Sequence, residues 1–244
     1  MGSSLQPGLK ALIKRVFSLI GLGIYRLPPK DAKPPHKVVV KSALHHNSKE
    51  GLNAFYLDKE AVESYLDPGF YQRLIDLLAA NGVDYNEKRV ADVGCGTGGL
   101  LDALKTRAQT QSLTGFEYSE NALAIARSQV SGVEFCDFDI YDGCARQFDV
   151  IFCIETLEHL LHPDKALRNI LGMLAPSGSA LLTVPNGRID TFEGHINFWS
   201  PESWNVFLKS VCNGCSVRSG LTENGENNYA VIMKPALSET QVSQ

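Results

Sequence analysis

A glycine-rich stretch near the middle of the chain constrains the fold more than any other feature. Residues 89–93 read Arg-Val-Ala-Asp-Val, and glycines follow at 94, 96, 98 and 99 before an apolar run that begins at Leu100. This order predicts a strand, a tight turn and a helix. Glycines let the backbone approach a bound ligand closely, and the N-terminus of a helix offers unpaired N–H donors. We therefore expect a ligand-binding loop here.

An acidic residue follows the glycines at the spacing used by nucleotide-binding folds. Glu117 ends a second apolar run, about 20 positions further on, where a carboxylate can bind ribose hydroxyls. Apolar runs and helical patterns then alternate as far as residue 184, and apolar stretches at 214–219 and 228–233 can supply two more strands. This alternation predicts an α/β fold with a parallel sheet and helices on both faces.

The loop at 92–98, Asp-Val-Gly-Cys-Gly-Thr-Gly, resembles that of the class I S-adenosylmethionine-dependent methyltransferases. The resemblance covers roughly residues 52–235 and continues in order through Glu117, the segment 136–140 and two apolar runs at 148–155 and 180–186. It implies S-adenosyl-L-methionine as cofactor. It also implies a Rossmann-like, seven-stranded, mostly parallel sheet with helices on both faces, to which this chain adds an N-terminal helical extension. The alternative is a glycine loop that binds another nucleotide.

Residue by residue, the resemblance places the methionine end of the cofactor at Asp92 and its ribose at Glu117. Residues 94–98 would face the ribose and the methionine, and the adenine would lie beside Asp139 and Ile140. The implied cofactor-binding residues are Asp92, Gly94, Cys95, Gly96, Gly98, Glu117, Tyr118, Asp139, Ile140 and Cys153.

Candidate catalytic groups follow the fourth and fifth predicted strands. Ligands of open α/β sheets gather at the carboxyl ends of the strands, so these two segments should lie near the transferred group. If residues 155–159 turn helical, Glu155, Glu158 and His159 project from one face. His195 follows the fifth strand within an aromatic stretch. Phe192, Phe198 and Trp199 are candidates to line an acceptor pocket, whereas Trp204 is expected in the core.

The segment Glu-x-x-Glu-His at 155–159 is similar to that of the ubiquinone-biosynthesis O-methyltransferases. Together with His195 it also resembles the small-RNA 3′-terminal 2′-O-methyltransferases, which implies that Glu155, Glu158, His159 and His195 bind Mg²⁺ or Mn²⁺. Such a cation lowers the pKa of a bound hydroxyl. Two alternatives stay open: His195 or His159 acts as a metal-free base, or these residues only fix the loop.

The acceptor is expected to be a hydroxyl group. No Pro-Cys pair occurs, and the Asp/Asn-Pro-Pro-Tyr/Phe signature of base-amino methyltransferases is absent after the fourth strand. We therefore predict O-methylation of a small-molecule, glycan or lipid-linked acceptor. One alternative is a metal-dependent 2′-O-methyltransferase for RNA ends, and another is a non-catalytic cofactor-binding subunit.

Charge is unevenly divided along the chain. Residues 1–41 carry a net charge of +7 and the remaining residues carry −11, which disfavours nucleic acid as a partner of the catalytic body. Residues 9–27 show a basic amphipathic helical pattern that predicts contact with a membrane surface or packing on the catalytic domain or a second subunit. Prolines at 28–37 predict an extended linker.

These patterns divide the chain into three predicted parts. Residues 1–51 form the basic helix and linker, with His45 and His46 solvated. Residues 52–235 form the methyltransferase domain, with a helical cap at 52–88, and residues 236–244 form a flexible tail. Six irregularly spaced cysteines predict no disulfide framework and a cytoplasmic, reducing location, with membrane association through the helix as a further expectation. The lone pair Cys212 and Cys215 is interpreted as ordinary thiols.

Overall fold

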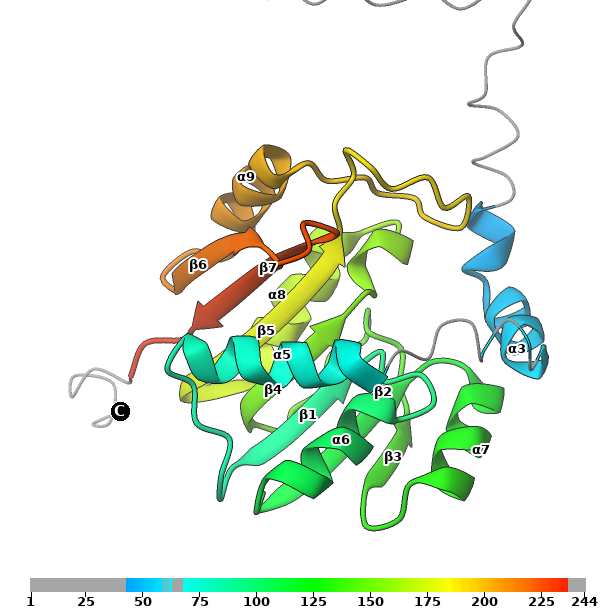
Figure 1. The fold of residues 1–244 in the computed structure, drawn as a ribbon, viewed down its shortest axis with the longest axis horizontal. Coiled ribbons are helices and arrows are strands. Elements are labelled where there is room, and N and C mark those ends of the chain that lie inside the picture. The colour runs from blue at the N-terminus through cyan, green and yellow to red at the C-terminus, as the bar shows by residue number, and fades with distance from the viewer. Residues whose placement is uncertain (1–42, 59, 61, 63–67, 237–244) are drawn as a thin grey trace, which may run out of the picture. The chain divides into compact units, whose positions relative to one another are not determined.

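The computed structural model describes residues 43–58, 60, 62 and 68–236. These residues form one seven-stranded sheet with helices packed against it (Figure 1). The strand order is β3-β2-β1-β4-β5-β7-β6; β1 to β5 pair in parallel, and β7 runs antiparallel to both β5 and β6. The predicted fold class is thus confirmed. The strands are β1 Arg89–Val93, β2 Ser112–Glu117, β3 Glu134–Asp137, β4 Phe148–Ile154, β5 Leu174–Pro185, β6 Ser216–Leu221 and β7 Asn227–Met233.

Helices cover both faces of this sheet. α5, α6 and α7 pack on one face, and α8 and α9 pack on the other. The helix bounds are α3 Lys49–Leu57, α5 Pro68–Ala80, α6 Gly99–Arg107, α7 Glu120–Gln129, α8 Pro163–Met173 and α9 Pro201–Val211, with a short 3₁₀ helix η1 at Leu157–His159. Helix α9 is capped at its start: the Ser203 N–H donates to Ser200 Oγ at 3.2 Å, and Pro201 occupies the first helical position.

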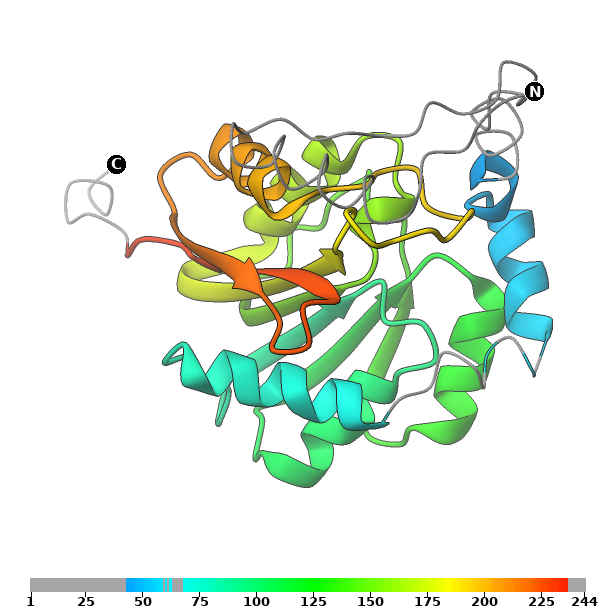
Figure 2. The same cartoon turned by 45° about the horizontal axis from the view of Figure 1, so that its top comes forward.

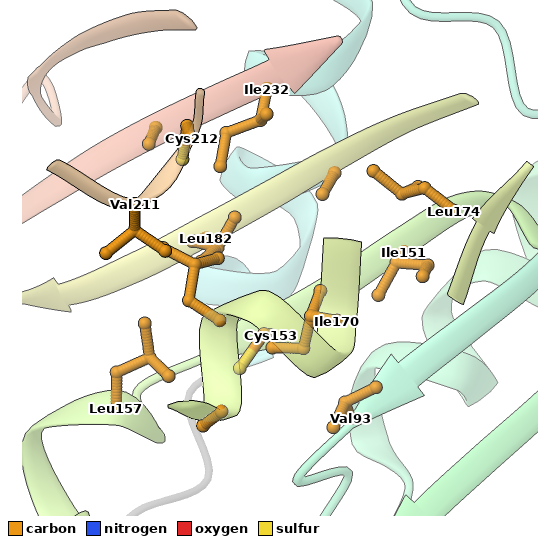
Figure 3. Packing of buried hydrophobic residues seen from close by; sticks show 14 of the residues in the cluster. Val93, Ile151, Cys153, Leu157, Ile170, Leu174, Leu182, Val211, Cys212 and Ile232 are labelled. Carbon is orange, nitrogen blue, oxygen red and sulfur yellow. The ribbon is translucent and has the colours of Figure 1, made fainter. Parts of the chain in front are cut away.

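The alternation of side chains along β4 builds a core on each face of the sheet. Ile151 and Cys153 face α8, where Figure 3 shows them with Leu182 of β5 and Ile170 of α8. Their neighbour Phe152 points to the opposite face, among side chains of α5, α6 and α7. Because β4 is buried on both faces, it is apolar almost throughout.

The N-terminal boundary of the folded unit lies earlier than the sequence predicts. α3 begins at Lys49, so the predicted boundary between residues 51 and 52 falls inside a helix, and residues 43–46 are also helical. His45 is exposed as expected, but the prediction of a solvated His46 is wrong. Its ring is half-buried and lies 5.7 Å from the ring of Phe55 and 5.6 Å from that of Phe192.

Helix α5 begins at Pro68, within the segment 52–88 that was predicted as a helical cap. The predicted amphipathic helix at 9–27, the proline linker and the tail from residue 237 lie outside the described residues. Within the described part of the chain, we find no helix whose length and apolarity would let it cross a membrane.

Gly94 brings the loops after β1 and β4 together. It has a φ of +81°, a conformation that favours glycine, and a Cβ at this position would lie 2.4 Å from Thr156 Oγ1. The glycine therefore sets how closely the loops approach at the carboxyl edge of the sheet, where β1 separates β2 from β4. This is the topological switch point at which open α/β sheets bind ligands.

Candidate functional site

Two neighbouring cavities open at the carboxyl edge of the sheet. The larger, of about 530 Å³, lies between the ends of β2 and β3, residues of the segment 44–52 and the chain after β4. The smaller, of about 310 Å³, lies between the glycine loop, residues of α5 and the same chain after β4. Both are lined by Gly94, Glu155 and His159, so the two cavities meet at the glycine loop.

Glu117 is fixed at the floor of the larger cavity by local hydrogen bonds. Its carboxylate accepts from the backbone N–H groups of Gly96 at 2.9 Å, Tyr118 at 2.9 Å and Ser119 at 2.8 Å. Burial raises the pKa of Glu117, and these three hydrogen bonds oppose that rise. A carboxylate has about four acceptor sites, so Glu117 can still accept from a ligand hydroxyl. Tyr118, Asp139 and Ile140 line the same cavity.

Asp92 lines the smaller cavity together with Cys95 and Gly96. Its side chain is buried, and Oδ1 has no hydrogen-bond partner among the described residues. Burial, and after it the charge of Glu117, raises the pKa of Asp92 to about 8. A buried carboxylate with an unsatisfied oxygen is stabilised by a cationic ligand. Asp92 therefore favours a ligand that carries positive charge into this cavity.

Two predicted cofactor-binding residues line neither cavity. Cys153 is fully buried in the core, and its side chain faces Leu182 and Ile170 rather than the glycine loop (Figure 3). Gly98 has a packing role, because a Cβ there would lie 2.9 Å from the ring of Phe135. The backbone of the glycine loop and the side chain of Thr97, which sequence reasoning missed, are the parts of this segment that reach the smaller cavity.

The chain after β4 is not the helical turn expected from Glu-x-x-Glu-His. Glu155 has a φ of +48°, which is rare for a residue with a side chain, and only Leu157–His159 form a 3₁₀ helix. Glu158 and His159 still project together, but Glu155 does not join their group. It lines both cavities from the opposite end of the turn. The prediction of one shared helical face is therefore wrong for Glu155.

His195 reaches this turn because the loop after β5 is tied to it. The backbone N–H groups of Ile196 and Asn197 both donate to the Glu158 carbonyl, at 2.8 and 3.0 Å. The Asn197 side chain donates to the Leu160 carbonyl at 2.7 Å. These bonds place His195 Nε2 3.9 Å from Glu158 Oε1, the same distance as His159 Nε2. Sequence positions about 40 residues apart thus meet at one point.

Asp190 orients His195, and sequence reasoning missed it. Its Oδ2 lies 2.6 Å from His195 Nδ1, and its Oδ1 accepts from the backbone N–H of Phe192 at 3.0 Å. When Nδ1 carries the ring proton, Asp190 accepts it and leaves Nε2 as the basic atom facing Glu158. The available signal was an acidic residue five positions before His195, but no spacing rule identifies such a pair in a loop.

Glu158, His159 and His195 form a compact group of potential metal ligands. One ligand atom from each lies within 4.8 Å of the other two. Both Glu158 carboxylate oxygens and His159 Nδ1 are buried without a hydrogen-bond partner among the described residues. Burial and the neighbouring Glu155 raise the pKa of Glu158 well above its ordinary value, whereas burial, His195 and His46 lower the pKa of His159 to about 3. His159 is therefore neutral, as a metal ligand or a hydrogen-bonding group must be.

The aromatic side chains near His195 divide between the site and the core. The rings of Phe192 and Phe198 lie 4.8 and 6.2 Å from the His195 ring, and both side chains are partly exposed. Trp199 instead packs against Trp204 at 5.4 Å in the core, where Trp204 was expected. Of the predicted aromatic cluster, the two phenylalanines therefore adjoin the His195 ring, whereas Trp199 belongs to the core.

Comparisons with known proteins agree with this geometry. A family model described as "Methyltransferase domain" matches residues 63–211. A ubiquinone biosynthesis O-methyltransferase of Coxiella burnetii is 26% identical over 155 residues, which cover 61% of this chain and 58% of that relative. A protein of the same name from Pseudomonas syringae pv. tomato is 36% identical over 124 residues, 46% of this chain and 52% of that relative. The chain thus spans little more than half the length of these curated relatives.

Among solved structures, an N-methyltransferase from Bradyrhizobium japonicum in complex with S-adenosyl-L-homocysteine superposes with a TM-score of 0.60. It is 19% identical, and the match covers 78% of this chain and 99% of that one. At this identity the likeness concerns the fold, because one fold hosts many functions.

Proposed function

Because this chain belongs to the methyltransferase-domain family of S-adenosylmethionine-dependent enzymes, we propose that it transfers a methyl group to an oxygen of a small-molecule, glycan or lipid-linked acceptor. The observation that carries the oxygen assignment is the His195–Asp190 pair at 2.6 Å, which faces the turn shared by the two cavities. An imidazole held in this way is suited to remove a proton from a hydroxyl near neutral pH.

The residues of the cofactor side fit S-adenosylmethionine. Glu117 offers a fixed carboxylate for ribose hydroxyls, and Asp92 offers an unsatisfied buried carboxylate for the positively charged methionine end. Asp139 and Ile140 line the larger cavity beyond Glu117, on the side proposed for the adenine. When bound, S-adenosylmethionine supplies a methyl group on a sulfonium, and transfer of that methyl leaves S-adenosylhomocysteine.

The acceptor side then supplies the base. His195 Nε2 would accept the proton of the acceptor hydroxyl, which would leave the acceptor oxygen as the nucleophile for the methyl group. Asp190 holds the proton on Nδ1 and stabilises the imidazolium that results. His159, neutral and adjacent at a ring distance of 4.7 Å, can hydrogen-bond the acceptor without competing for its proton.

A metal-assisted form of the same reaction is the second candidate, and the convergence of Glu158, His159 and His195 favours it. The unpartnered oxygens of Glu158 and the neutral His159 fit a divalent cation, and one carboxylate with two imidazoles suits Mn²⁺ better than Mg²⁺. Such a cation would lower the pKa of an acceptor hydroxyl. Glu155, outside the group, would remain free to bind the acceptor or a water.

An RNA-end methyltransferase and a non-catalytic subunit find less support. A surface for RNA phosphates needs clustered basic residues, but residues 42–244 carry a net charge of −11. A protein that only binds cofactor needs no oriented imidazole, yet Asp190 orients His195 beside the cavity.

The test has two steps. Calorimetry with S-adenosylhomocysteine should show one site per chain; no binding would defeat the cofactor assignment. Methyl-labelled S-adenosylmethionine is then offered with hydroxylated phenols, glycans and lipid-linked alcohols, each beside its deoxy analogue, and with matched amines. Label on the hydroxyl compounds alone supports the proposal, and label on amines alone overturns the oxygen assignment. Loss of turnover in a chelator with rescue by Mn²⁺ selects the metal-assisted form.

A further inference from the structure

Residues 43–57 form a tightly packed helical unit at the mouth of the larger cavity. Ser48 joins its two helical parts: its hydroxyl donates to the His45 carbonyl at 2.8 Å and accepts from the Gly51 N–H at 3.1 Å. A Cβ on Gly51 would lie 2.0 Å from the His45 carbonyl oxygen, so the parts touch backbone to backbone. Because the two parts are in direct contact and share the hydrogen bonds of Ser48, we expect a displacement at one end of this unit to be passed to the other.

One end of the unit is attached to the cofactor side. The Asn53 side chain accepts from Ser119 Oγ at 2.7 Å, and the Asn53 carbonyl accepts from the Asn121 side chain at 2.9 Å. Ser119 also donates its backbone N–H to Glu117. Lys49 adds an ion pair with Glu120 at 3.0 Å. The unit therefore rests on the same turn that fixes the ribose-binding carboxylate.

The other end is attached to the loop that carries His195. Asn47 Nδ2 donates to the Gly194 carbonyl at 2.8 Å, across 147 residues of sequence. The His46 ring lies 5.6 Å from that of Phe192, and a Cβ on Gly194 would come within 2.9 Å of His46. The blue α3 region and the gold loop after β5 lie side by side in both views (Figures 1 and 2). Asn47 is thus a polar link to the backbone beside the base.

The Asn47 amide also faces the cofactor cavity. Asn47 lines that cavity, and its Oδ1 is buried with no hydrogen-bond partner among the described residues. A donor on a bound ligand would satisfy this oxygen while the amide nitrogen holds Gly194. We propose that Asn47 is a positioning residue through which bound S-adenosylmethionine stabilises the His195 loop, so that the base is held more firmly in place when the methyl donor is present. This inference rests on the proposed function.

The consequence is energetic coupling between the two halves of the site. A ligand that stabilises the unit at residues 43–57 also stabilises the loop bonded to it, and by linkage an ordered loop tightens cofactor binding. His195 is then held most firmly when the donor site is filled.

Hydrogen–deuterium exchange on the full chain, with and without S-adenosylhomocysteine, tests this coupling. In the wild type, the ligand should slow exchange at residues 188–197 as well as in the cavity walls. Asn47→Ala should still bind S-adenosylhomocysteine, with affinity reduced roughly two- to tenfold by loss of one hydrogen-bonding side chain. The added protection at 188–197 should be lost, while protection of the glycine loop at 92–98 remains.

Asn81→Ala is the matched control, because Asn81 Nδ2 also donates to a backbone carbonyl, that of Leu77 at 2.9 Å, away from both cavities. It should respond to the ligand as the wild type does. Asn53→Ala removes the side-chain hydrogen bond that attaches the unit to the cofactor side. It should also abolish the ligand-induced protection of residues 188–197, and it replaces Asn47→Ala as the test if that variant folds poorly. Two outcomes would overturn this inference alone. One is that the ligand protects residues 188–197 from exchange equally in the wild type and in a folded Asn47→Ala or Asn53→Ala variant. The other is that the ligand binds the wild type but gives residues 188–197 no added protection. Absence of binding in the wild type overturns the proposed function with it.

Discussion

The two halves of the site satisfy their polar groups in different ways. On the cofactor side, Glu117 accepts three backbone hydrogen bonds from residues on adjacent turns. On the acceptor side, both oxygens of Glu158, one oxygen of Glu155 and Nδ1 of His159 are buried without partners among the described residues. The cofactor side has two such atoms among the described residues, Asp92 Oδ1 and Asn47 Oδ1. On the cofactor side, most buried polar groups are thus hydrogen-bonded within the protein. On the acceptor side, several of them depend on a bound group for their hydrogen-bond partners.

The energetically unfavourable interactions of the fold are therefore concentrated on the acceptor side. An unsatisfied buried polar group costs about 1–3 kcal/mol, so several together are tolerated only where the rest of the structure is stable. The rare φ of Glu155 adds to that cost at the same turn. The Asp190–His195 pair is an exception on this side, because its two side chains hydrogen-bond to each other. The acceptor side therefore has the character of a catalytic surface, and the cofactor side that of a preformed binding site.

The largest effect should come from His195→Ala. Loss of the base is expected to lower kcat by about 10²–10⁴-fold. The affinity for S-adenosylhomocysteine should change little, because the substitution leaves the Asn47–Gly194 hydrogen bond and the residues of the cofactor side in place. Kinetics with the acceptor found above, beside calorimetry, measure both quantities. His45→Ala, an exposed imidazole, is the control and should match the wild type. Equal losses of turnover and cofactor affinity would contradict the division into two halves.

Glu117→Gln should show the opposite pattern. The variant keeps one acceptor oxygen but loses the charge, so the affinity for S-adenosylhomocysteine should fall by roughly 1.5–3 kcal/mol, and turnover at saturating cofactor should fall less. Calorimetry and kinetics at saturation separate the two. Asp102→Asn removes an exposed carboxylate nearby on α6 and should leave affinity unchanged. Full affinity in Glu117→Gln would remove Glu117 from the cofactor site.

The same contrast explains what could be predicted from the sequence. Asp92, the glycine loop and Glu117 are close in sequence, and their positions follow from strand, turn and helix signals with known spacing. Tyr118, Asp139 and Ile140 came instead from the resemblance to class I methyltransferases, and all three line the larger cavity. The central strands β1, β4 and β5 could be predicted too, because strands buried on both faces have a clear apolar pattern.

The acceptor side could be predicted only in part. Glu158, His159 and His195 were identifiable by residue type, but the helical spacing assumed for Glu155 failed because the turn after β4 is a 3₁₀ helix. Asp190 depends on loop hydrogen bonds that no periodic pattern encodes. His46 was assigned to a solvated loop because polar neighbours hide the contacts it makes across the chain. Long-range loop contacts are where sequence patterns carry least information.

A smaller effect, on the cofactor side, should appear in the pH dependence of stability. The folded-state pKa of Asp92 is about 8, against an ordinary value of 3.8, so between these values the folded chain holds a proton that the unfolded chain has released. Stability should therefore fall as pH rises from 6.5 to 8, by about 1.4 kcal/mol per pH unit at most, or roughly 3–6 °C in Tm per pH unit. Melting curves of the ligand-free protein and Asp92→Asn measure this, and the variant should lose less. Parallel curves would show that Asp92 ionises normally.

The smallest effect should be the contribution of His159, on the acceptor side, to the pH dependence of stability. It has the opposite sign to that of Asp92, because it lowers stability as pH falls. His159 has a folded-state pKa of about 3, against an ordinary value of 6.5. As pH falls between these two values, His159 binds a proton in the unfolded chain but not in the folded chain. Its contribution to stability is present above pH 6.5 and is lost below it; because 23% of the side chain is exposed, we expect roughly 1 kcal/mol between pH 6.5 and 4.5. His159→Gln should reduce this acid-side loss, measured by melting in a chelator so that no cation competes with the proton. A His159→Gln profile identical to that of the wild type would mean that His159 already titrates normally, and a readily protonated imidazole would weaken the metal-assisted mechanism, which requires it neutral.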